Sequence, residues 1–267
     1  MINRMIRALS VLLLCVSFTA AAAEEGGAVL QQAGNSLQDK GSLQRGAGLY
    51  MNYCAACHSL KYMRYSRIAK DLDLSEEQVM GNLNFSGAKF GEQIHVAMPD
   101  EQATRWFGKM PPDLSVISRV RGSDWIYSYL KSFYLDESRP LGWNNTVFPN
   151  ASMPNPFWEL QGLQHPEFGP KQPTGETGDD GKPLLACAHG AVEADDRCIQ
   201  TLVLPQPGQQ TAAEFDQTVR DVTNFLEYVG EPAALKRQSI GVWVILFLAL
   251  LTFLAWLLKQ EYWRDVH

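Results

Sequence analysis

The chain is 267 residues long and acidic, with 23 lysines and arginines against 29 aspartates and glutamates and a formal net charge of −6. This balance disfavours a nucleic-acid-binding protein. It suits docking of a basic partner through long-range attraction, and it equally suits simple solubility, which charge alone does not separate from docking. Once an N-terminal and a C-terminal apolar segment are set aside, about 215 residues remain, which suits one domain with one sizeable core.

The first 23 residues have the pattern of a secretory signal peptide. Arg4 and Arg7 precede a mostly apolar run from Ala8 to Phe18, and small residues follow up to Ala23. The apolar run is too short to span a bilayer, and small residues at its end suit the signal peptidase. We therefore predict that residues 1–23 are removed and that the rest of the chain is exported.

A helix is predicted directly before a short cysteine motif. Leu43, Ala47 and Tyr50 recur at the spacing of one helical face, and the string Cys54-Ala55-Ala56-Cys57-His58 follows. This string is typical of c-type haem attachment. Two thiols three positions apart can add to the two vinyl groups of a porphyrin, and the next residue can present an imidazole to the iron. The motif predicts one covalent haem c on Cys54 and Cys57, with His58 as an axial ligand.

Two other interpretations of the cysteine pair are weaker. A zinc site could recruit Cys187 and Cys198 to complete four thiolates, but these two are more widely spaced than the usual paired zinc knuckles. A thioredoxin-type pair should follow a strand and open a helix, whereas this pair ends a predicted helix. The sequence therefore favours the haem over both alternatives.

Three methionines downstream of the motif are candidates for the second axial ligand. Met98, Met110 and Met153 are each followed by proline, which can fix an extended backbone over the haem. A methionine sulfur opposite histidine raises the redox potential and closes the iron to small ligands, which suits electron transfer. Spacing alone does not choose among the three.

A second long helix is predicted over residues 212–229, near the end of the domain. Its apolar residues form one stripe at helical spacing. The stripe consists of Phe215, Val219, Val222, Leu226 and Val229. We expect this helix to cross the one before the motif, where Gly46 permits close approach of the two backbones. The fold expected is mainly α, a class I cytochrome c-like domain with long irregular loops.

The C-terminal segment Ile240–Leu258 is predicted to be one transmembrane helix. Its 19 residues carry no charge, and Trp243 and Trp256 lie near its ends. At about 1.5 Å per residue it reaches about 28 Å, close to the ~30 Å of a hydrocarbon core. A buried core helix would show a polar stripe, and this segment is apolar all round.

The signal peptide and this helix together predict the topology. Residues 24–238 form an exported domain, residues 239–259 form the membrane anchor, and residues 260–267 form a cytoplasmic tail. Loop charges are balanced across the anchor, so the orientation depends on the signal peptide rather than on a positive-inside bias. We expect a single-pass protein of a bacterial cytoplasmic (inner) membrane, with the haem domain on the periplasmic side.

Several segments resemble the cytochrome c1 family, the haem subunits of the ubiquinol:cytochrome c reductase (bc1) complex. They are SLQRGAGLYMNYCAACHSLKYMRY, MPPDLSVISRVRG, FPNASMP and DVTNFLEYVGEPAALKRQSIGVWVILF. The resemblance implies that Met153 is the second axial ligand of the iron and that Arg121 lies near a haem propionate. It also implies that Pro112, Asp113 and Leu114 shape the haem pocket, without a chemical role of their own.

The resemblance also implies the partners. A Rieske iron-sulfur protein would reduce the haem, cytochrome c would accept the electron, and cytochrome b would share a dimeric membrane complex. No substrate chemistry is expected of the isolated chain. The alternatives are a haem subunit of another membrane complex, such as an oxidase or nitric oxide reductase, and a haem sensor or enzyme with an open iron site.

The sequence departs from this family pattern between Gln161 and Gln210. The stretch is rich in proline, glycine and acidic residues and is interpreted as a loop insertion. Cys187 and Cys198 lie in it, outside the haem motif and in an oxidising compartment. We expect them to form a disulfide that staples the insertion.

Overall fold

The computed structural model describes most of the domain predicted to be exported and the C-terminal helix. The described residues are 29–96, 98–177, 181, 183–188, 190–194 and 197–264. The predicted signal peptide lies outside them, as do the last three residues of the predicted cytoplasmic tail.

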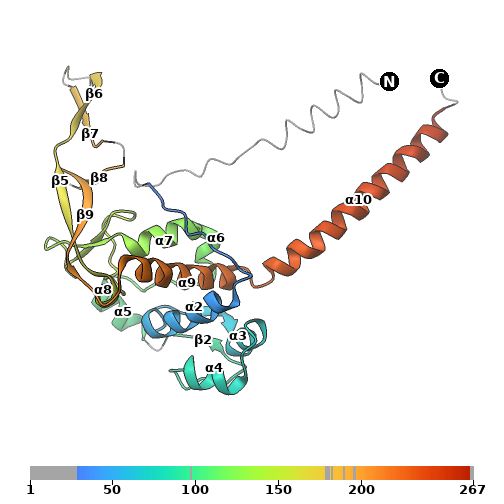
Figure 1. Cartoon of the computed structure of the whole chain (residues 1–267), viewed down its shortest axis with the longest axis horizontal. Coiled ribbons are helices and arrows are strands. Elements are labelled where there is room, and N and C mark those ends of the chain that lie inside the picture. Colours follow the sequence, from blue (N-terminus) through green and yellow to red (C-terminus); the bar gives the residue numbers. More distant parts are fainter. Residues whose placement is uncertain are drawn as a thin grey trace.

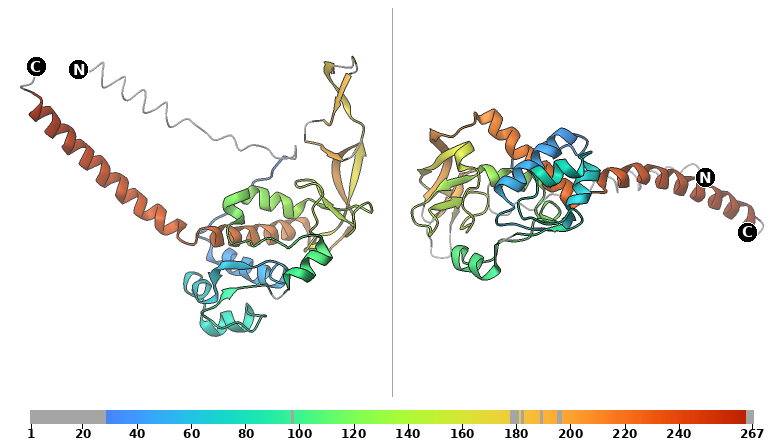
Figure 2. Two further views of the ribbon diagram at one scale, coloured as in Figure 1. Left: turned by 180° about the vertical axis from the view of Figure 1, so that it is seen from behind. Right: turned by 90° about the horizontal axis from the view of Figure 1, so that it is seen from below.

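Two crossing helices form the centre of the domain, as the sequence predicts. Helix α2 (Lys40–Tyr53) packs against helix α9 (Ala212–Gly230), and the two lie side by side in Figures 1 and 2. At the crossing, a Cβ added to Gly46 would lie 2.1 Å from the backbone oxygen of Asp221. All five stripe residues of α9 are buried. The predicted close approach at Gly46 is therefore confirmed.

Polar side chains of α2 and α9 form hydrogen bonds with each other at the same crossing. The Asp221 carboxylate, 2 % exposed, accepts hydrogen bonds from the Ser42 hydroxyl at 2.7 Å and from Arg45 Nε at 2.6 Å. Asn224 Nδ2 donates to the Ser42 hydroxyl at 3.0 Å. A buried carboxylate is costly unless it is paired, so these partners favour the one alignment of α2 and α9 that satisfies it.

Shorter helices surround the central pair. They are α3 (Tyr65–Asp71), α4 (Glu76–Asn82), α5 (Asp100–Phe107), α6 (Ile117–Arg121), α7 (Ser123–Lys131) and α8 (Trp158–Gln161). Helices α6 and α7 pack on α9, where the Ser118 hydroxyl donates to the Leu226 carbonyl at 3.0 Å. The helical domain expected from the sequence is confirmed.

Short antiparallel strands join the helices. They are β1 (Leu60–Arg64), β2 (Gln93–Ile94), β3 (Phe133–Leu135), β4 (Trp143–Asn145), β5 (Gly162–Gly169), β6 (Gln172–Thr177), β7 (Pro183–Ala186), β8 (Val192–Ala194) and β9 (Arg197–Pro207). In the described chain, β1 pairs with β2, β3 with β4, and β6 with β7, and a three-stranded sheet has the order β5-β9-β8.

The insertion is more regular than the sequence indicates. The region between Gln161 and Gln210, expected as a loop, forms strands β5 to β9 and projects from the helical domain in Figure 1. The run Ile199–Leu204 contains β-branched residues that favour a strand. Its partners in β5 lie 31 to 38 residues earlier, from the pair Phe168–Ile199 to the pair His165–Val203, so the ladder depends on a contact that local patterns do not show.

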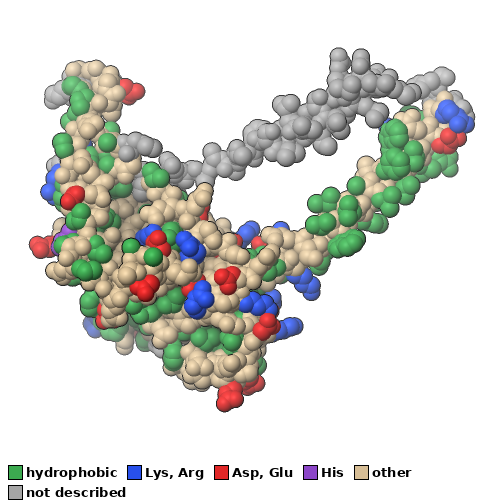
Figure 3. All heavy atoms as spheres, in the orientation of Figure 1, with side chains coloured by type: hydrophobic (Ala, Val, Ile, Leu, Met, Phe, Trp, Pro, Cys, Tyr) green, Lys and Arg blue, Asp and Glu red, His purple; other side chains and the backbone are tan. Residues whose placement is uncertain are grey.

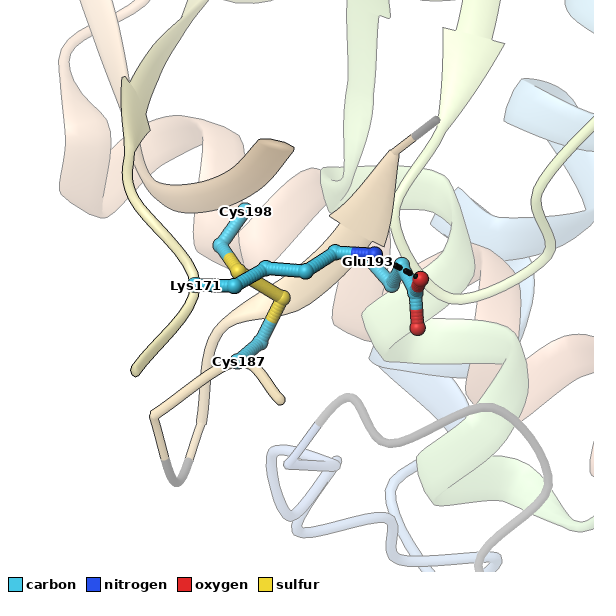
Figure 4. Close-up of a disulfide and its surroundings, with 4 residues drawn as sticks. All are labelled: Lys171, Cys187, Glu193 and Cys198. Atoms are coloured by element: carbon cyan, nitrogen blue, oxygen red, sulfur yellow. Dashed lines mark hydrogen bonds and ion pairs between the residues drawn. A yellow bond between two sulfur atoms is a disulfide. The ribbon is translucent and has the colours of Figure 1, made fainter. Parts of the chain in front are cut away.

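The predicted disulfide is present in this insertion. Cys187 and Cys198 are bonded, with their Cα atoms 5.5 Å apart (Figure 4). Lys171 forms an ion pair with Glu193 beside the bond (Figure 4). Because both sulfurs are used, the four-thiolate zinc set considered above is excluded.

Helix α10 (Ala234–Tyr262) extends away from the domain in both views of Figure 2. It contains the predicted span, and its most apolar 18-residue window has no residue buried against the rest of the described chain. Hydrophobic side chains run along it in Figure 3. At about 1.5 Å per residue its 29 residues exceed the ~30 Å of a hydrocarbon core, so it is long and apolar enough to cross a membrane.

Candidate haem-binding site

The cysteine motif is one tight turn at the C-terminal end of α2. The N–H of Cys54 donates to the Tyr50 carbonyl at 2.8 Å, and the N–H groups of Cys57 and His58 both donate to the Cys54 carbonyl at 3.0 and 2.9 Å. The helix therefore passes directly into the motif, as predicted. This placement differs from the thioredoxin arrangement, in which the cysteine pair opens a helix.

The two motif cysteines are free thiols in a protected place. Cys54 is buried and Cys57 is half-buried, and neither is disulfide-bonded. Burial raises the pKa of Cys54 to about 12 and also raises the pKa of Cys57. Both side chains are therefore protonated at neutral pH, which disfavours a thiolate nucleophile. Two such thiols three positions apart suit covalent addition to a porphyrin.

The imidazole of His58 forms a hydrogen bond through Nδ1, which leaves Nε2 as the nitrogen that can bind a metal. Its Nδ1 lies 2.7 Å from the backbone oxygen of Pro112. A carbonyl oxygen can only accept, so Nδ1 carries the proton and Nε2 keeps its lone pair. Burial lowers the pKa of His58, which favours the neutral ring. This is the state that a histidine needs to bind a metal through Nε2.

The backbone of His58 is fixed as well. The Tyr50 hydroxyl donates to the His58 carbonyl oxygen at 2.7 Å, and Tyr50 is fully buried. Burial also raises the pKa of Tyr50, so its hydroxyl stays protonated and remains a donor. The spacing of Tyr50 marks it as a core residue, but its hydrogen bond to the motif has no counterpart in the sequence pattern.

The three candidate methionines lie in three different loops. Met98 and Met110 flank helix α5, and Met153 lies between β4 and α8. Each is half-buried. Asn155, two residues after Met153, is buried. Its side-chain amide donates to Gln161 Oε1 at 2.9 Å, which connects the end of this loop to α8.

Arg121 and Pro112 occupy different surroundings. Arg121 ends α6, and its guanidinium carbon lies 5.0 Å from the centre of the Trp125 ring and 5.7 Å from that of Phe148. Pro112 contributes its carbonyl to His58, as described above. The structure therefore brings Pro112 to the motif through a backbone atom, a role that side-chain patterns do not reveal.

The chemistry of these groups fits one covalent haem. The motif offers two protonated, unbridged thiols and a neutral imidazole whose Nε2 is available, and the described residues contain no cluster of three or more histidines, cysteines or acidic residues suited to a metal ion. Together with helix α10, the fold and the site are those of a membrane-anchored c-type cytochrome.

Comparison with known proteins narrows this class. The model of the Cytochrome C1 family matches residues 32–168 and 200–266. Cytochrome c1 of Allochromatium vinosum is 47% identical over 249 residues, which are 93% of this chain and 94% of the relative. The chain therefore belongs to the cytochrome c1 family.

Two further relatives show how widely the sequence is shared. The ammonia monooxygenase gamma subunit of Nitrosomonas europaea is 41% identical, over 86% of this chain and 85% of the relative. The mitochondrial cytochrome c1 haem protein of Saccharomyces cerevisiae is 28% identical, over 85% of this chain and 68% of the relative.

Family membership settles the cofactor and the complex. The chain carries one covalently attached haem c and is the haem subunit of a bc1 complex, in which it serves electron transport. Helix α10 anchors it to the membrane. The family match omits residues 169–199, which agrees with the insertion recognised in the sequence.

Proposed function

We propose that the haem is bound through thioethers to Cys54 and Cys57, with His58 Nε2 and the Met153 sulfur as axial ligands. One observation carries this proposal: the Pro112 carbonyl accepts from His58 Nδ1 at 2.7 Å, which leaves Nε2 of the motif histidine available. When bound, the haem supplies a one-electron redox centre. Two axial ligands from the protein would close the iron to small molecules, which favours electron transfer over oxygen chemistry.

Two further residues of the chain are assigned to the same site. Arg121 would place its guanidinium near a haem propionate, where it would offset negative charge. Trp125 and Phe148 support this role, because both rings lie within 6 Å of the guanidinium carbon and limit its movement. Pro112 would hold the His58 ring in one orientation, because an imidazole that donates to a fixed carbonyl cannot rotate freely.

We propose that the electron comes from a Rieske iron-sulfur protein and goes to cytochrome c, in a dimeric complex shared with cytochrome b. Membership of the bc1 complex supports these partners. The net charge of −6 supports a basic electron acceptor, because complementary charge speeds encounter. In this reaction the chain makes and breaks no bond of a substrate; it sets the potential of its cofactor and presents it to the two partners.

The proposed topology has the signal peptide at residues 1–23, the haem domain at 24–238 on the periplasmic side of a bacterial inner membrane, the anchor at 239–259 and the tail at 260–267. Helix α10 supports the position of the anchor. The disulfide between Cys187 and Cys198 supports export, because such bonds persist in oxidising compartments.

Protease treatment of intact spheroplasts tests this topology. The haem domain should be digested, while an epitope placed after His267 should be cut only when the membrane is permeabilised. Digestion of the epitope in intact spheroplasts, with the haem domain protected, would reverse the orientation.

Haem staining of the denatured polypeptide and co-purification test the function together. A stained band that Cys54→Ser and Cys57→Ser together abolish would support the covalent site. Cytochrome b and a Rieske protein should co-purify with the native chain. Purification with an oxidase or a nitric oxide reductase instead would favour another membrane complex, and binding of carbon monoxide to the reduced native protein would favour an open iron site.

A further inference from the structure

Two short segments beside the haem motif are joined along their length. Residues 59–62 follow His58 directly, and residues 112–115 begin at Pro112, whose carbonyl holds the His58 ring. Three hydrogen bonds link the two segments. They are Leu114 N–H to the Ser59 carbonyl at 2.9 Å, Lys61 N–H to Asp113 Oδ2 at 2.9 Å, and Tyr62 N–H to the Ser115 hydroxyl at 3.1 Å. The position of the Pro112 carbonyl therefore depends on how these segments are joined.

The Asp113 carboxylate is the central part of this junction. Its Oδ2 accepts from Lys61 N–H across the junction, and its Oδ1 accepts from Ser115 N–H within its own turn, both at 2.9 Å. An ionised carboxylate forms stronger bonds to backbone N–H groups than a neutral acceptor does. Because Asp113 directly follows Pro112, fixing both oxygens of Asp113 also fixes the peptide that bears the Pro112 carbonyl.

Two buried serines, Ser59 and Ser115, limit the movement of this junction. Ser115 is 1 % exposed and Ser59 is 4 % exposed, so their bonds are sheltered from water. The Ser59 hydroxyl also accepts from Val96 N–H at 2.8 Å, which adds the segment after β2 to the junction. The Lys61–Asp113 bond itself is exposed, so the two buried serines limit how far the segments can relax when the Asp113 carboxylate is removed.

We propose that Asp113 is a positioning residue that sets the electron-donating strength of His58. A histidine that donates from Nδ1 to a well-placed carbonyl is a more basic ligand through Nε2, and a more basic ligand favours the ferric state. Asp113 holds that carbonyl in place, and so it keeps the redox potential of the haem low relative to a site with a loose carbonyl. This inference depends on the proposed function, because it requires His58 to bind the haem iron.

The test compares Asp113→Asn and Asp113→Ala with wild type in the full complex. The midpoint potential is measured by redox titration of the haem α band, and the ligand field by the EPR g values of the ferric haem. We expect the ferric–ferrous equilibrium to shift toward the ferrous form three- to tenfold in Asp113→Ala, where tenfold is about 59 mV for one electron. Asp113→Asn keeps one acceptor oxygen and should show a smaller shift of the same sign.

Loss of a negative charge near the haem would also raise the potential, and comparing the two variants separates the causes. A half-buried charge is only partly screened by salt, so ionic strength does not separate them. Charge loss alone gives Asp113→Asn and Asp113→Ala equal shifts and the g values of wild type, and that result overturns positioning. A larger shift in Asp113→Ala than in Asp113→Asn, with altered g values, supports it. If Asp113→Ala fails to assemble, altered g values in Asp113→Asn, which nearly preserves the shape of the side chain, support positioning and unchanged ones overturn it.

A matched control comes from the other end of α2. Asp39 is exposed and accepts from Ser42 N–H at 3.0 Å, and α2 separates it from the motif by about 21 Å of helix. Asp39→Ala also removes one charge and one backbone hydrogen bond, and it should leave the potential and the g values unchanged. If the wild-type band carries no covalent haem, the proposed function fails. If it carries haem and the Asp113 variants keep its potential, only the positioning role fails.

Discussion

Replacing Gly46 by alanine tests the helix crossing that closes the haem domain. In the structure, a Cβ at this position would lie 2.1 Å from the Asp221 backbone oxygen and 2.7 Å from the Phe225 Cβ. Both atoms belong to α9 near the centre of the crossing, so no flexible side chain can move aside. We expect Gly46→Ala to push α2 and α9 apart.

The magnitude follows from two opposing terms. Alanine is favoured over glycine inside a helix by about 1 kcal/mol, whereas overpacking a core typically costs about 1–3 kcal/mol and occasionally more. A contact of 2.1 Å must lengthen by nearly 1 Å to reach the shortest separation that a Cβ tolerates, so the cost lies at the upper end. A net loss of about 2 kcal/mol lowers the Tm of a domain of this size by about 4–8 °C.

Gly48 provides the matched control in the same helix. A Cβ there meets no atom within 4 Å, so Gly48→Ala should gain helix propensity without a clash and stabilise the domain by up to about 1 kcal/mol. Thermal unfolding of the purified complex, followed by the haem spectrum, measures both variants. Equal Tm values for Gly46→Ala and Gly48→Ala would refute the assignment of the crossing to close backbone packing.

Three further predictions concern the site and the insertion. Met153→Leu should retain covalent haem, lower its redox potential and weaken quinol oxidation; a redox titration that shows no change would move the ligand to Met110 or Met98. Tyr50→Phe should cost about 1–3 kcal/mol in denaturant unfolding, because the buried His58 carbonyl loses its partner. Replacing Cys187 and Cys198 by serine should cost the insertion up to about 3 kcal/mol, seen as faster proteolysis within it at an unchanged haem potential.

Local patterns were enough to predict the framework of the haem domain. The helical spacing of Leu43, Ala47 and Tyr50 placed a helix before the motif, and all three residues are buried. The apolar stripe of residues 212–229 and the uncharged run Ile240–Leu258 likewise fall within α9 and α10. These signals succeed because each helix shows its buried or lipid-facing side through the order of its own residues.

The junction around His58 could not be predicted in the same way. The Pro112 carbonyl is a backbone group. Every residue has one, so the type of side chain does not indicate which carbonyl will contact His58. Asp113 acts through two backbone N–H groups, one of them 52 residues earlier in the chain. Such bonds depend on where strand β1 and a loop distant in sequence meet, and no periodic pattern predicts that contact. The sequence pattern also does not select the second axial ligand from Met98, Met110 and Met153, because all three lie in loops and precede proline.

The insertion shows how an addition can be accommodated without disturbing this junction. Residues 169–199 fall outside the family match, whereas the motif, the 112–115 segment and both crossing helices fall inside it. Strand β6 pairs with β7, β8 pairs with β9, and Cys187 is bonded to Cys198. The insertion meets the haem domain away from this junction, where Gln164 Nε2 donates to the carbonyls of Lys131 and Phe133 at 2.9 and 2.7 Å. The residues that hold His58 can therefore keep one geometry while the outer surface of the subunit varies.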